Sequence, residues 1–337
     1  MNKERNHIID ILRGIAIFLV VFGHVTHLPE LRTYIWGFHI PIFFFISGLL
    51  FRKEKFEKFT DFLKSRLKNI VWPYAIFYLA TLVYWILIER HSRGADVSVG
   101  SQLIGLVYGT YDMRYMMFNG ALWFIPCLFS MEMLYWFVSK CSKRIYLIGV
   151  LISFYIIGLV LKDNAPWLPW GLCAAFIGIV FYGIGDMCKP IVLSNKVQFW
   201  GRDKSPLKYL IFTLILAIQL AALPWTGADL ASLKVGNVWL YIPISMLGIT
   251  LYWGIASTIS HNKIIEYLGV NSLVIFAFQE PVYRAVIFIV SKIIGWPVQE
   301  VRCDLLLCLF ISVCSILVIV PMLVCWNKWA RPLIKRI

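Results

Sequence analysis

Four residues of types that can do acid–base or ionic chemistry lie in one otherwise apolar run near the N-terminus. The stretch DILRGIAIFLVVFGHVTH contains Asp10, Arg13, His24 and His27. Arg13 and His24 are eleven positions apart, close to three full turns of an α-helix, so both lie on one face about 16 Å apart. Asp10 precedes Arg13 by three residues and falls on the same stripe. The run therefore presents a carboxylate, a guanidinium and an imidazole in one line.

Ionisable groups inside an apolar helix raise its free energy, and two explanations stand. Asp10 and Arg13 could form an ion pair that only sets the depth of a membrane helix, with His24 a neutral core histidine bonded to a carbonyl. Alternatively, the guanidinium and the imidazole belong to a functional site, which is the default interpretation of such groups within a membrane span. An imidazole, with its ordinary pKa of about 6.5, suits removal of a proton from a hydroxyl group.

Further polar and aromatic residues in apolar runs have two interpretations each. His39, in FHIPIFFF, either orients His24 or holds a substrate carbonyl, or it is a plain surface residue. Glu280 and Arg284 are four apart and can pair, either as a structural ion pair or as part of a site. Trp123, in ALWFIPCLF, either stacks on a substrate or belongs to an interfacial aromatic belt.

Ser47 and Gly48 interrupt the apolar run FFFISGLL. Small residues allow helices to approach closely, and we expect this packing role here. No activating base lies near Ser47 in the sequence, so we do not expect it to act as a nucleophile.

The composition is that of a polytopic membrane protein. The 337-residue chain is 60% hydrophobic and 15% charged, with a mean hydropathy of +0.76. Continuous apolar runs without period-two alternation exclude a barrel, so the expected fold is an all-α bundle of membrane-spanning helices. A span needs roughly 20 residues. Ten runs meet this length approximately: 8–27, 35–51, 71–89, 121–139, 145–161, 170–188, 207–224, 238–259, 272–290 and 305–327.

The net charge of +14 is distributed asymmetrically between the segments that join these runs. Of the 32 Lys and Arg residues, 22 fall in segments on the N-terminal side of the membrane and 8 on the other side. The positive-inside rule then predicts that both termini are cytoplasmic. Topology and anionic membrane lipids account for the charge, and no nucleic-acid partner is expected.

We expect residues 1–337 to form a single transmembrane domain. Residues 53–70 combine apolar residues at spacings of three and four with Lys and Arg opposite, which predicts an amphipathic helix in the cytoplasmic interface. Residues 90–120 contain a half-apolar piece too short to span, either re-entrant or covering the outer mouth of a cavity. The eight cysteines form no C-x-x-C motif, so neither a disulfide framework nor a metal site is expected.

Several motifs together resemble the acyltransferase-3 family of integral-membrane sugar O-acyltransferases, and the chain looks closest to the fucose 4-O-acetylase-like branch. The first motif is D-x-x-R-G with GH ten residues after its Arg, and the second is FHIPIFFFISGLL at 38–50. Three more follow: FLKSRLKNIVWPY at 62–74, ALWFIPCLF at 121–129 and NSLVIFAFQEPV at 271–282.

The resemblance implies transfer of an acyl group, usually acetyl from cytoplasmic acetyl-CoA, to a hydroxyl of a cell-envelope polysaccharide or lipid-linked glycan. It also implies a location in the bacterial inner membrane. The Arg and His of the family's first helix are regarded as functional, which maps onto Arg13 and His24. Relatives often carry a His where this chain has Gln279, and an amide takes no proton near neutral pH.

These expectations assign roles to particular residues. Acyl-CoA is polyanionic, so Arg13, Arg66 and Lys68 are expected at the inner mouth, although Arg66 and Lys68, each taken singly, are better explained as ordinary cytoplasmic charges. The expected base is His24. The catalytic candidates are His24, Arg13, Asp10 and Glu280. The substrate-binding candidates are His39, Trp123, Arg284, Gln279, Arg66 and Lys68.

A flippase or exporter of a lipid-linked sugar or small anion is the alternative function, because polar residues at mid-membrane also mark transport paths. Transporters often contain paired broken helices in two related halves, and the sequence contains no such pairing. The acyl group could also be succinyl or longer, and the sequence leaves the oligomeric state open.

Overall fold

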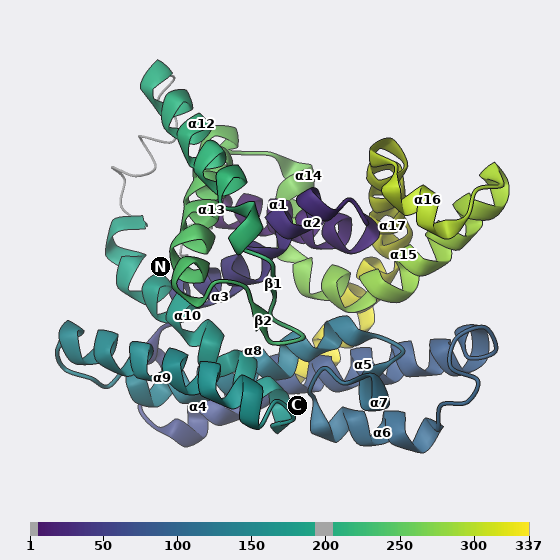
Figure 1. Cartoon of the computed structure of the whole chain (residues 1–337). Coiled ribbons are helices and arrows are strands. Elements are labelled where there is room, and N and C mark those ends of the chain that lie inside the picture. The colour runs from purple at the N-terminus through teal and green to yellow at the C-terminus, as the bar shows by residue number, and fades with distance from the viewer. Residues whose placement is uncertain (1–5, 193–204, 337) are drawn as a thin grey trace.

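The computed structural model describes residues 6–192 and 205–336. These residues are almost wholly helical (Figure 1). The two short strands, β1 (Ala228–Asp229) and β2 (Lys234–Val235), form one antiparallel hairpin. The expected all-α helix bundle is confirmed.

Eight helices among the described residues are long and apolar enough to cross a membrane. Four of these candidate spans each consist of one α-helix: α1 (His7–Val25), α9 (Arg144–Asn164), α13 (Val238–Ile259) and α15 (Ser272–Ile294). Each of the other four joins elements that follow one another without a break. The first consists of α4 (Phe59–Arg66), η2 (Leu67–Val71), α5 (Trp72–Tyr84) and η3 (Trp85–Glu89). The other three are η4 (Gly120–Trp123) with α8 (Phe124–Val138), η5 (Pro169–Gly171) with α10 (Leu172–Val192), and α17 (Leu305–Cys325) with η7 (Trp326–Ala330).

Shorter elements fill the remaining connections. They are α2 (Pro29–Trp36), α3 (His39–Leu49), η1 (Lys53–Lys55), α6 (Val99–Tyr108), α7 (Met113–Met116), α12 (Pro206–Ala221), η6 (Leu223–Trp225), α14 (Lys263–Val270), α16 (Val298–Cys303) and α18 (Arg331–Arg336).

The expected number of ten spans is not confirmed. The runs 35–51 and 207–224 correspond to α3 and α12, which have 11 and 16 residues. At 1.5 Å per residue, neither alone covers the roughly 30 Å of a hydrocarbon core. A turn at Gly37 and Phe38 interrupts the helical backbone between α2 and α3, so the two do not form one longer helix. The orientation of the spans stays a prediction.

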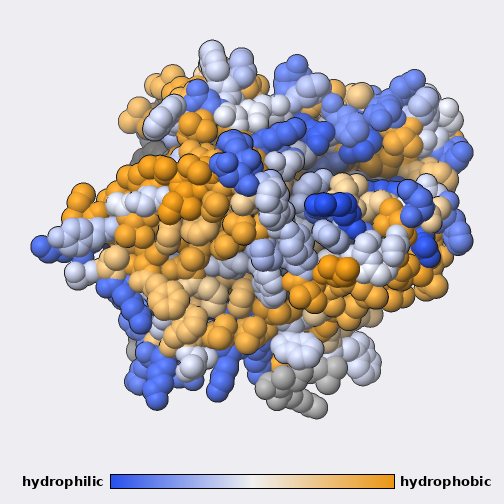
Figure 2. Space-filling model, turned by 60° about the horizontal axis from the view of Figure 1, so that its bottom comes forward, coloured by the Kyte–Doolittle hydropathy of each residue, from blue (hydrophilic) through white to orange (hydrophobic). Residues whose placement is uncertain are grey.

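The surface fits a membrane environment. Along α9, Ile152, Ile156 and Val160 are each more than half exposed. Figure 2 shows apolar side chains spread over much of the middle of the visible face, with hydrophilic residues gathered toward its upper and lower margins. Exposed apolar surface on this scale is unfavourable in water and favourable against lipid tails. The chain is a multi-pass integral membrane protein.

The helix α1 lies at the centre of the bundle, where it contacts α3, α13, α14, α15 and α17. Glycine permits its closest contact, because a Cβ on Gly14 would overlap the carbonyl oxygen of Ile265 in α14. In the same way, a Cβ on Gly48 would overlap the Tyr182 carbonyl where α3 crosses α10. The expected packing role of Gly48 is therefore confirmed.

The segment 53–70 is helical over only part of its length, and its expected place in the cytoplasmic interface stays a prediction. Its helix begins at Phe59 and continues through η2 into α5, giving one 31-residue helix that ends at Glu89. Phe62 is fully buried in this helix and stacks on Trp136 of α8, with ring centroids 4.6 Å apart, and Ile70 is buried as well. Packing against α8 therefore decides which face of this helix is buried.

Candidate active site

Arg13 lines a cavity of about 370 Å³, here named the Arg13 cavity. Asn6 fixes the start of α1, because its side chain accepts hydrogen bonds from the backbone N–H groups of Ile8 and Ile9. The cavity walls come from α3, from the helix that contains Arg66, and from α8 and α15. Asp10 is buried nearby and interacts electrostatically with Arg13. The carboxylate and guanidinium therefore share one end of α1, as the helical spacing predicts.

Arg66 lines the Arg13 cavity but is largely neutralised there. Its Nε lies 2.8 Å from Oε2 of Glu132, whose side chain is only 7% exposed, in an ion pair without hydrogen-bond geometry. The guanidinium also sits 4.9 Å from the centre of the Phe62 ring. Lys68 is not among the residues that line this cavity. Arg66 is thus a paired charge in the cavity wall, and its role in donor binding stays a prediction.

Ser47 also lines the Arg13 cavity, yet its hydroxyl group donates to the Phe43 carbonyl one turn earlier, at 2.8 Å. This hydrogen bond within the helix is common for serine, and it engages the hydroxyl proton with a backbone carbonyl. The geometry agrees with the expectation that Ser47 is not a nucleophile.

His24 lines a second cavity of about 210 Å³, here named the His24 cavity. Arg32 and Trp36 of α2, Tyr111 of the 109–112 turn and Asp229 of β1 contribute to its wall. A narrow adjoining recess of about 30 Å³ is lined by His24 and His39, among others. The 90–120 segment contributes Arg93, Met113 and Met117 to the wall of the His24 cavity, and its two expected arrangements stay predictions.

The imidazole of His24 lies among aromatic rings. The centroid of its ring is 5.5 Å from that of Trp36 and 6.3 Å from those of His39 and Tyr283, and the Tyr283 ring is nearly parallel to it. The backbone of this turn is held by Arg302 of α16, which donates to the carbonyl oxygens of His24 and Val25 at 2.6 and 2.9 Å. A guanidinium at a helix C-terminus satisfies carbonyls that lack partners within the helix.

His39 is buried, with 5% of its surface exposed, so the interpretation as a plain surface residue is wrong. Its Nδ1 lies 3.0 Å from the Ile35 carbonyl oxygen, which fixes the ring within the turn that joins α2 to α3. The position beside His24 supports the positioning role that the sequence offers as one alternative.

Glu280 and Arg284 form the expected ion pair, with 2.6 Å between Arg284 Nη1 and Glu280 Oε1. Arg284 also bonds Glu89 at 2.8 Å and the Phe118 carbonyl oxygen. Glu280 accepts a further hydrogen bond from the Ala121 backbone at 2.9 Å. Glu280 lines the His24 cavity and Arg284 does not. Arg284 therefore holds the Glu280 carboxylate from outside the cavity, an arrangement here named the Arg284 clamp.

Trp123 is 5% exposed and lines both the His24 cavity and the recess, so it does not belong to a lipid-facing belt. Gln279 is completely buried and lines none of the cavities described above. Within residues 6–192 and 205–336, neither atom of its amide has a hydrogen-bond partner. The expectation that Gln279 contacts substrate is not supported by this arrangement.

Arg13 and His24 line different cavities. Phe276 of α15 lines both the Arg13 cavity and the recess beside His24. Its ring centroid is 5.0 Å from that of Phe124, a second wall residue of the Arg13 cavity. We name these two rings the phenylalanine partition, because Phe276 belongs to the walls on both sides.

Tyr111 and His27 are among the groups outside the spans whose pKa values are shifted. Burial, followed by the charges of Asp229 and Glu280, raises the pKa of Tyr111, so this phenol in the wall of the His24 cavity remains a hydrogen-bond donor. Partial burial, followed by the charge of Arg302, lowers the pKa of His27. His27 bonds Gln299 and lies outside both cavities.

Sequence reasoning missed several wall residues of the His24 cavity. Arg32 and Arg93 carry a signal only as positive charges outside the predicted spans, and Asp229 lies in a hairpin with no motif. Glu89 ends a span and pairs with Arg284 from a distant part of the chain. Only the packing of α2, the hairpin and α15 around the end of α1 brings these groups together.

Comparison with known proteins gives one result. Residues 6–326 match the family model Acyl_transf_3, described as an acyltransferase domain, without resolving the fucose 4-O-acetylase-like branch. Searches of curated proteins and of solved structures found no match. The family match covers nearly the whole chain, including both cavities and the helix that joins them. The protein therefore belongs to the acyltransferase-3 family and is a membrane acyltransferase.

Proposed function

We propose that the protein transfers an acetyl group from acetyl-CoA to a hydroxyl of a cell-envelope polysaccharide or lipid-linked glycan, in the bacterial inner membrane. One observation carries the proposal. A single helix of a family acyltransferase presents a guanidinium to one cavity and an imidazole to another, and Phe276 lines both the first cavity and the recess beside the imidazole.

The Arg13 cavity is the donor side of this proposal. Its volume of about 370 Å³ lies within the range of roughly 300–1,000 Å³ typical of small-molecule sites. The positive-inside rule puts this end of α1 in the cytoplasm, where acyl-CoA is found. Arg13 supplies the cation for a phosphate or thioester oxygen, because guanidinium groups form strong, charge-assisted hydrogen bonds with such acceptors. Arg66, already paired with Glu132, contributes less.

The His24 cavity is the acceptor side. Trp123 and Trp36 offer aromatic faces to a sugar ring, while Arg32, Arg93 and Asp229 offer hydrogen bonds to its hydroxyls. Glu280 is held in the wall by Arg284 and the Ala121 amide, so its position is fixed before substrate arrives. Such preorganisation reduces the entropy lost on forming a reactive complex.

In the proposed reaction, His24 accepts the proton of the acceptor hydroxyl as the hydroxyl oxygen attacks the thioester carbonyl carbon. The new C–O bond forms, the carbonyl C–S bond breaks, and the coenzyme A thiolate takes the proton from the imidazolium. Atoms and charges balance without a further reactant. A positioned general base contributes about 10²–10⁴ in rate.

The test is transfer of labelled acetyl from acetyl-CoA to glycan in proteoliposomes that contain the purified protein. We expect label in glycan with the wild type, and none above background with His24→Ala. His27→Ala, a change three residues away and outside both cavities, should keep the activity. Unaltered labelling by folded, inserted His24→Ala would overturn the assignment of the base.

The same vesicles separate the alternative function. A flippase or exporter moves the lipid-linked sugar across the bilayer and leaves it unlabelled, whatever its rate. Mass spectrometry of the product distinguishes acetyl from succinyl transfer when each thioester is supplied in turn.

A further inference from the structure

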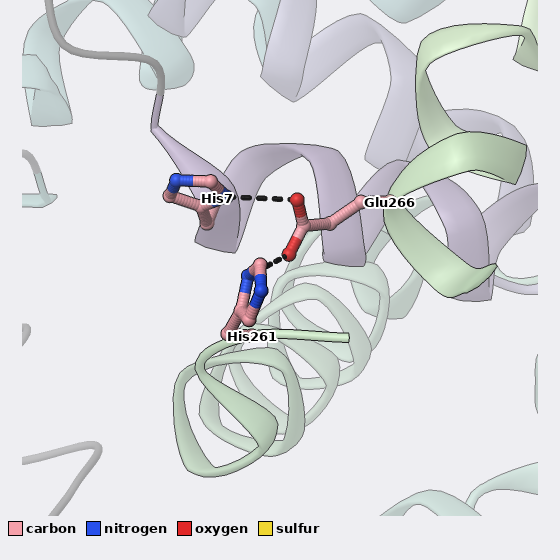
Figure 3. A group of neighbouring side chains, drawn as sticks. All are labelled: His7, His261 and Glu266. Carbon is pink, nitrogen blue, oxygen red and sulfur yellow. Dashed lines mark hydrogen bonds and ion pairs between the residues drawn. The ribbon is translucent and has the colours of Figure 1, made fainter. Parts of the chain in front are cut away.

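Three potential metal-binding side chains meet at the N-terminal end of α1, outside the Arg13 and His24 cavities. Glu266 of α14 lies between His7 of α1 and His261 of the α13–α14 connection (Figure 3). Its Oε2 is 2.8 Å from Nδ1 of His7, and its Oε1 is 2.6 Å from Nδ1 of His261. The two imidazole rings stand nearly perpendicular, with centroids 5.0 Å apart.

Local structure on both sides of the cluster holds these side chains in place. Asn6 caps α1, which makes His7 its first residue. Ser260 adopts a left-handed φ of 58°, turning the chain directly before His261. Asn262 caps α14, and its own backbone N–H donates to Glu266 Oε1 at 3.1 Å. The three residues, far apart in sequence, are thus specified by two helix caps and one strained turn.

We propose that His7, His261 and Glu266 bind a zinc ion. Two imidazoles and one carboxylate are an established three-ligand set for zinc, with water in the fourth position. Around tetrahedral zinc, with bonds of about 2.0–2.1 Å, ligand atoms lie roughly 3.3 Å apart. The three ligand atoms here all lie within 4.8 Å of one another, so small side-chain rotations bring them onto one ion.

The ligand types and their exposure select the ion. Magnesium and calcium prefer oxygen ligands, whereas two imidazole nitrogens favour zinc among the available divalent ions. The His7 and His261 side chains are 47% and 57% exposed, so an ion and its water reach them directly from solvent. Glu266, only 7% exposed, supplies the negative charge from inside.

The ion would fasten the first turn of α1 to α14 without touching substrate. These helices already approach closely, because a Cβ on Gly269 would overlap the Asp10 carbonyl oxygen. The N-termini of both helices meet at the cluster, and their partial positive charges oppose a cation. We therefore expect an affinity in the micromolar range rather than that of a four-ligand structural site.

The experiment measures zinc binding and thermal stability of the full chain in detergent, purified without a histidine tag and stripped with EDTA. We expect one saturable equivalent of zinc per chain, a rise in melting temperature on adding zinc, and no rise with magnesium. Cobalt should give the visible absorption of a four-coordinate ion. Loss of even an outer partner of a metal ligand weakens binding about 10–100-fold, so His261→Ala and Glu266→Gln should weaken it at least that much.

His91→Ala is the matched control, since His91 is an exposed histidine outside the cluster. It should bind zinc as the wild type does. His7→Asn is a milder second variant, which keeps the proposal testable if His261→Ala fails to fold. The proposal is overturned if no saturable zinc binds, or if His7→Asn and His91→Ala bind it equally. Neither outcome depends on acyl transfer, so the proposed function is tested separately.

Discussion

The Arg13 and His24 cavities lie along the same face of α1 but are built differently. The Arg13 cavity is larger, about 370 against 210 Å³, and most of its wall comes from helices. The His24 cavity is closed by short elements: α2, the 109–112 turn and the β1–β2 hairpin. Long helices offer a regular wall for one extended donor, whereas loops can vary the contacts made to an acceptor.

The difference shows that two residues can lie on the same face of a helix and still line different cavities. Three turns of α1 align Arg13 with His24 whatever surrounds them. Whether the two share one space depends on α15, which inserts Phe276 beside Phe124. If the proposed function holds, the thioester must reach His24 past this partition.

The largest effect should come from removing the imidazole. His24→Ala is expected to lower the transfer rate by about 10²–10⁴, because the acceptor hydroxyl loses its base. Binding of acetyl-CoA, measured by calorimetry, should be unchanged, since His24 lies across the partition from the Arg13 cavity. A parallel loss of donor binding would mean that the two cavities act as one.

The wall of the His24 cavity should depend strongly on Arg284. Arg284→Met leaves the Glu280 and Glu89 carboxylates partly buried without their shared cation, and breaking such a pair costs about 3–5 kcal/mol. We expect a lower melting temperature and loss of transfer together. The control is Arg114→Met, which breaks an exposed pair with Asp112 and should leave the melting temperature close to that of the wild type. Equal melting temperatures for the two variants would contradict the clamp.

Arg13→Gln should act on the donor side alone. A hydrogen bond to a charged group contributes about 1.5–3 kcal/mol, so KM for acetyl-CoA is expected to rise roughly 10- to 150-fold. Arg52→Gln removes an exposed charge in the basic stretch after α3 and should leave KM within about twofold. A lower kcat with an unchanged KM in steady-state kinetics would show that Arg13 does not act in donor binding.

Changes at Phe276 should open or close the phenylalanine partition. Phe276→Leu is expected to raise acetyl-CoA hydrolysis in the absence of acceptor several-fold, because water gains access to the thioester. Phe276→Trp should lower transfer and leave KM for acetyl-CoA unchanged. Phe278→Leu is the control, since Phe278 packs on Phe77 and lines neither cavity. If all three variants behave alike, the acyl group takes a different route.

We expect the smallest effect from lowering the pH, which should weaken the N-terminal end of α1 more than its C-terminal end. Burial by itself would raise the pKa of the Glu266 carboxyl group. The hydrogen bond from His7 and the charges of His7 and His261 outweigh burial, so that this pKa is lowered. Its contribution to stability is then present above its unfolded pKa of about 4.3 and is lost as pH falls through the lower folded value. Arg302, which holds the other end of α1, stays charged throughout.

Hydrogen exchange should therefore accelerate in the first turn of α1 as pH falls below about 4, relative to its last turn and after correction for intrinsic rates. Glu266→Gln should abolish the difference between the two ends. An equal response at both ends in the wild type would show that Glu266 does not hold α1.

Much of this architecture is predictable because hydropathy and spacing act locally. Apolar length predicts the helices, and the 3.6-residue period places Asp10, Arg13 and His24 on one stripe. The i, i+4 spacing predicts the Glu280–Arg284 pair, and small residues predict the close contact at Gly48. The number of spans stays a prediction, because α3 and α12 are apolar but have only 11 and 16 residues.

The sequence by itself determined that the chain is a helical membrane protein with an acid, a guanidinium and an imidazole in line on its first helix. Only the tertiary structure decided that two rings divide this line, that Glu89 completes the Arg284 clamp, and that His7 and His261 meet at Glu266. The reason is physical: periodicity fixes directions within one helix, whereas contacts between distant segments depend on how all the helices pack.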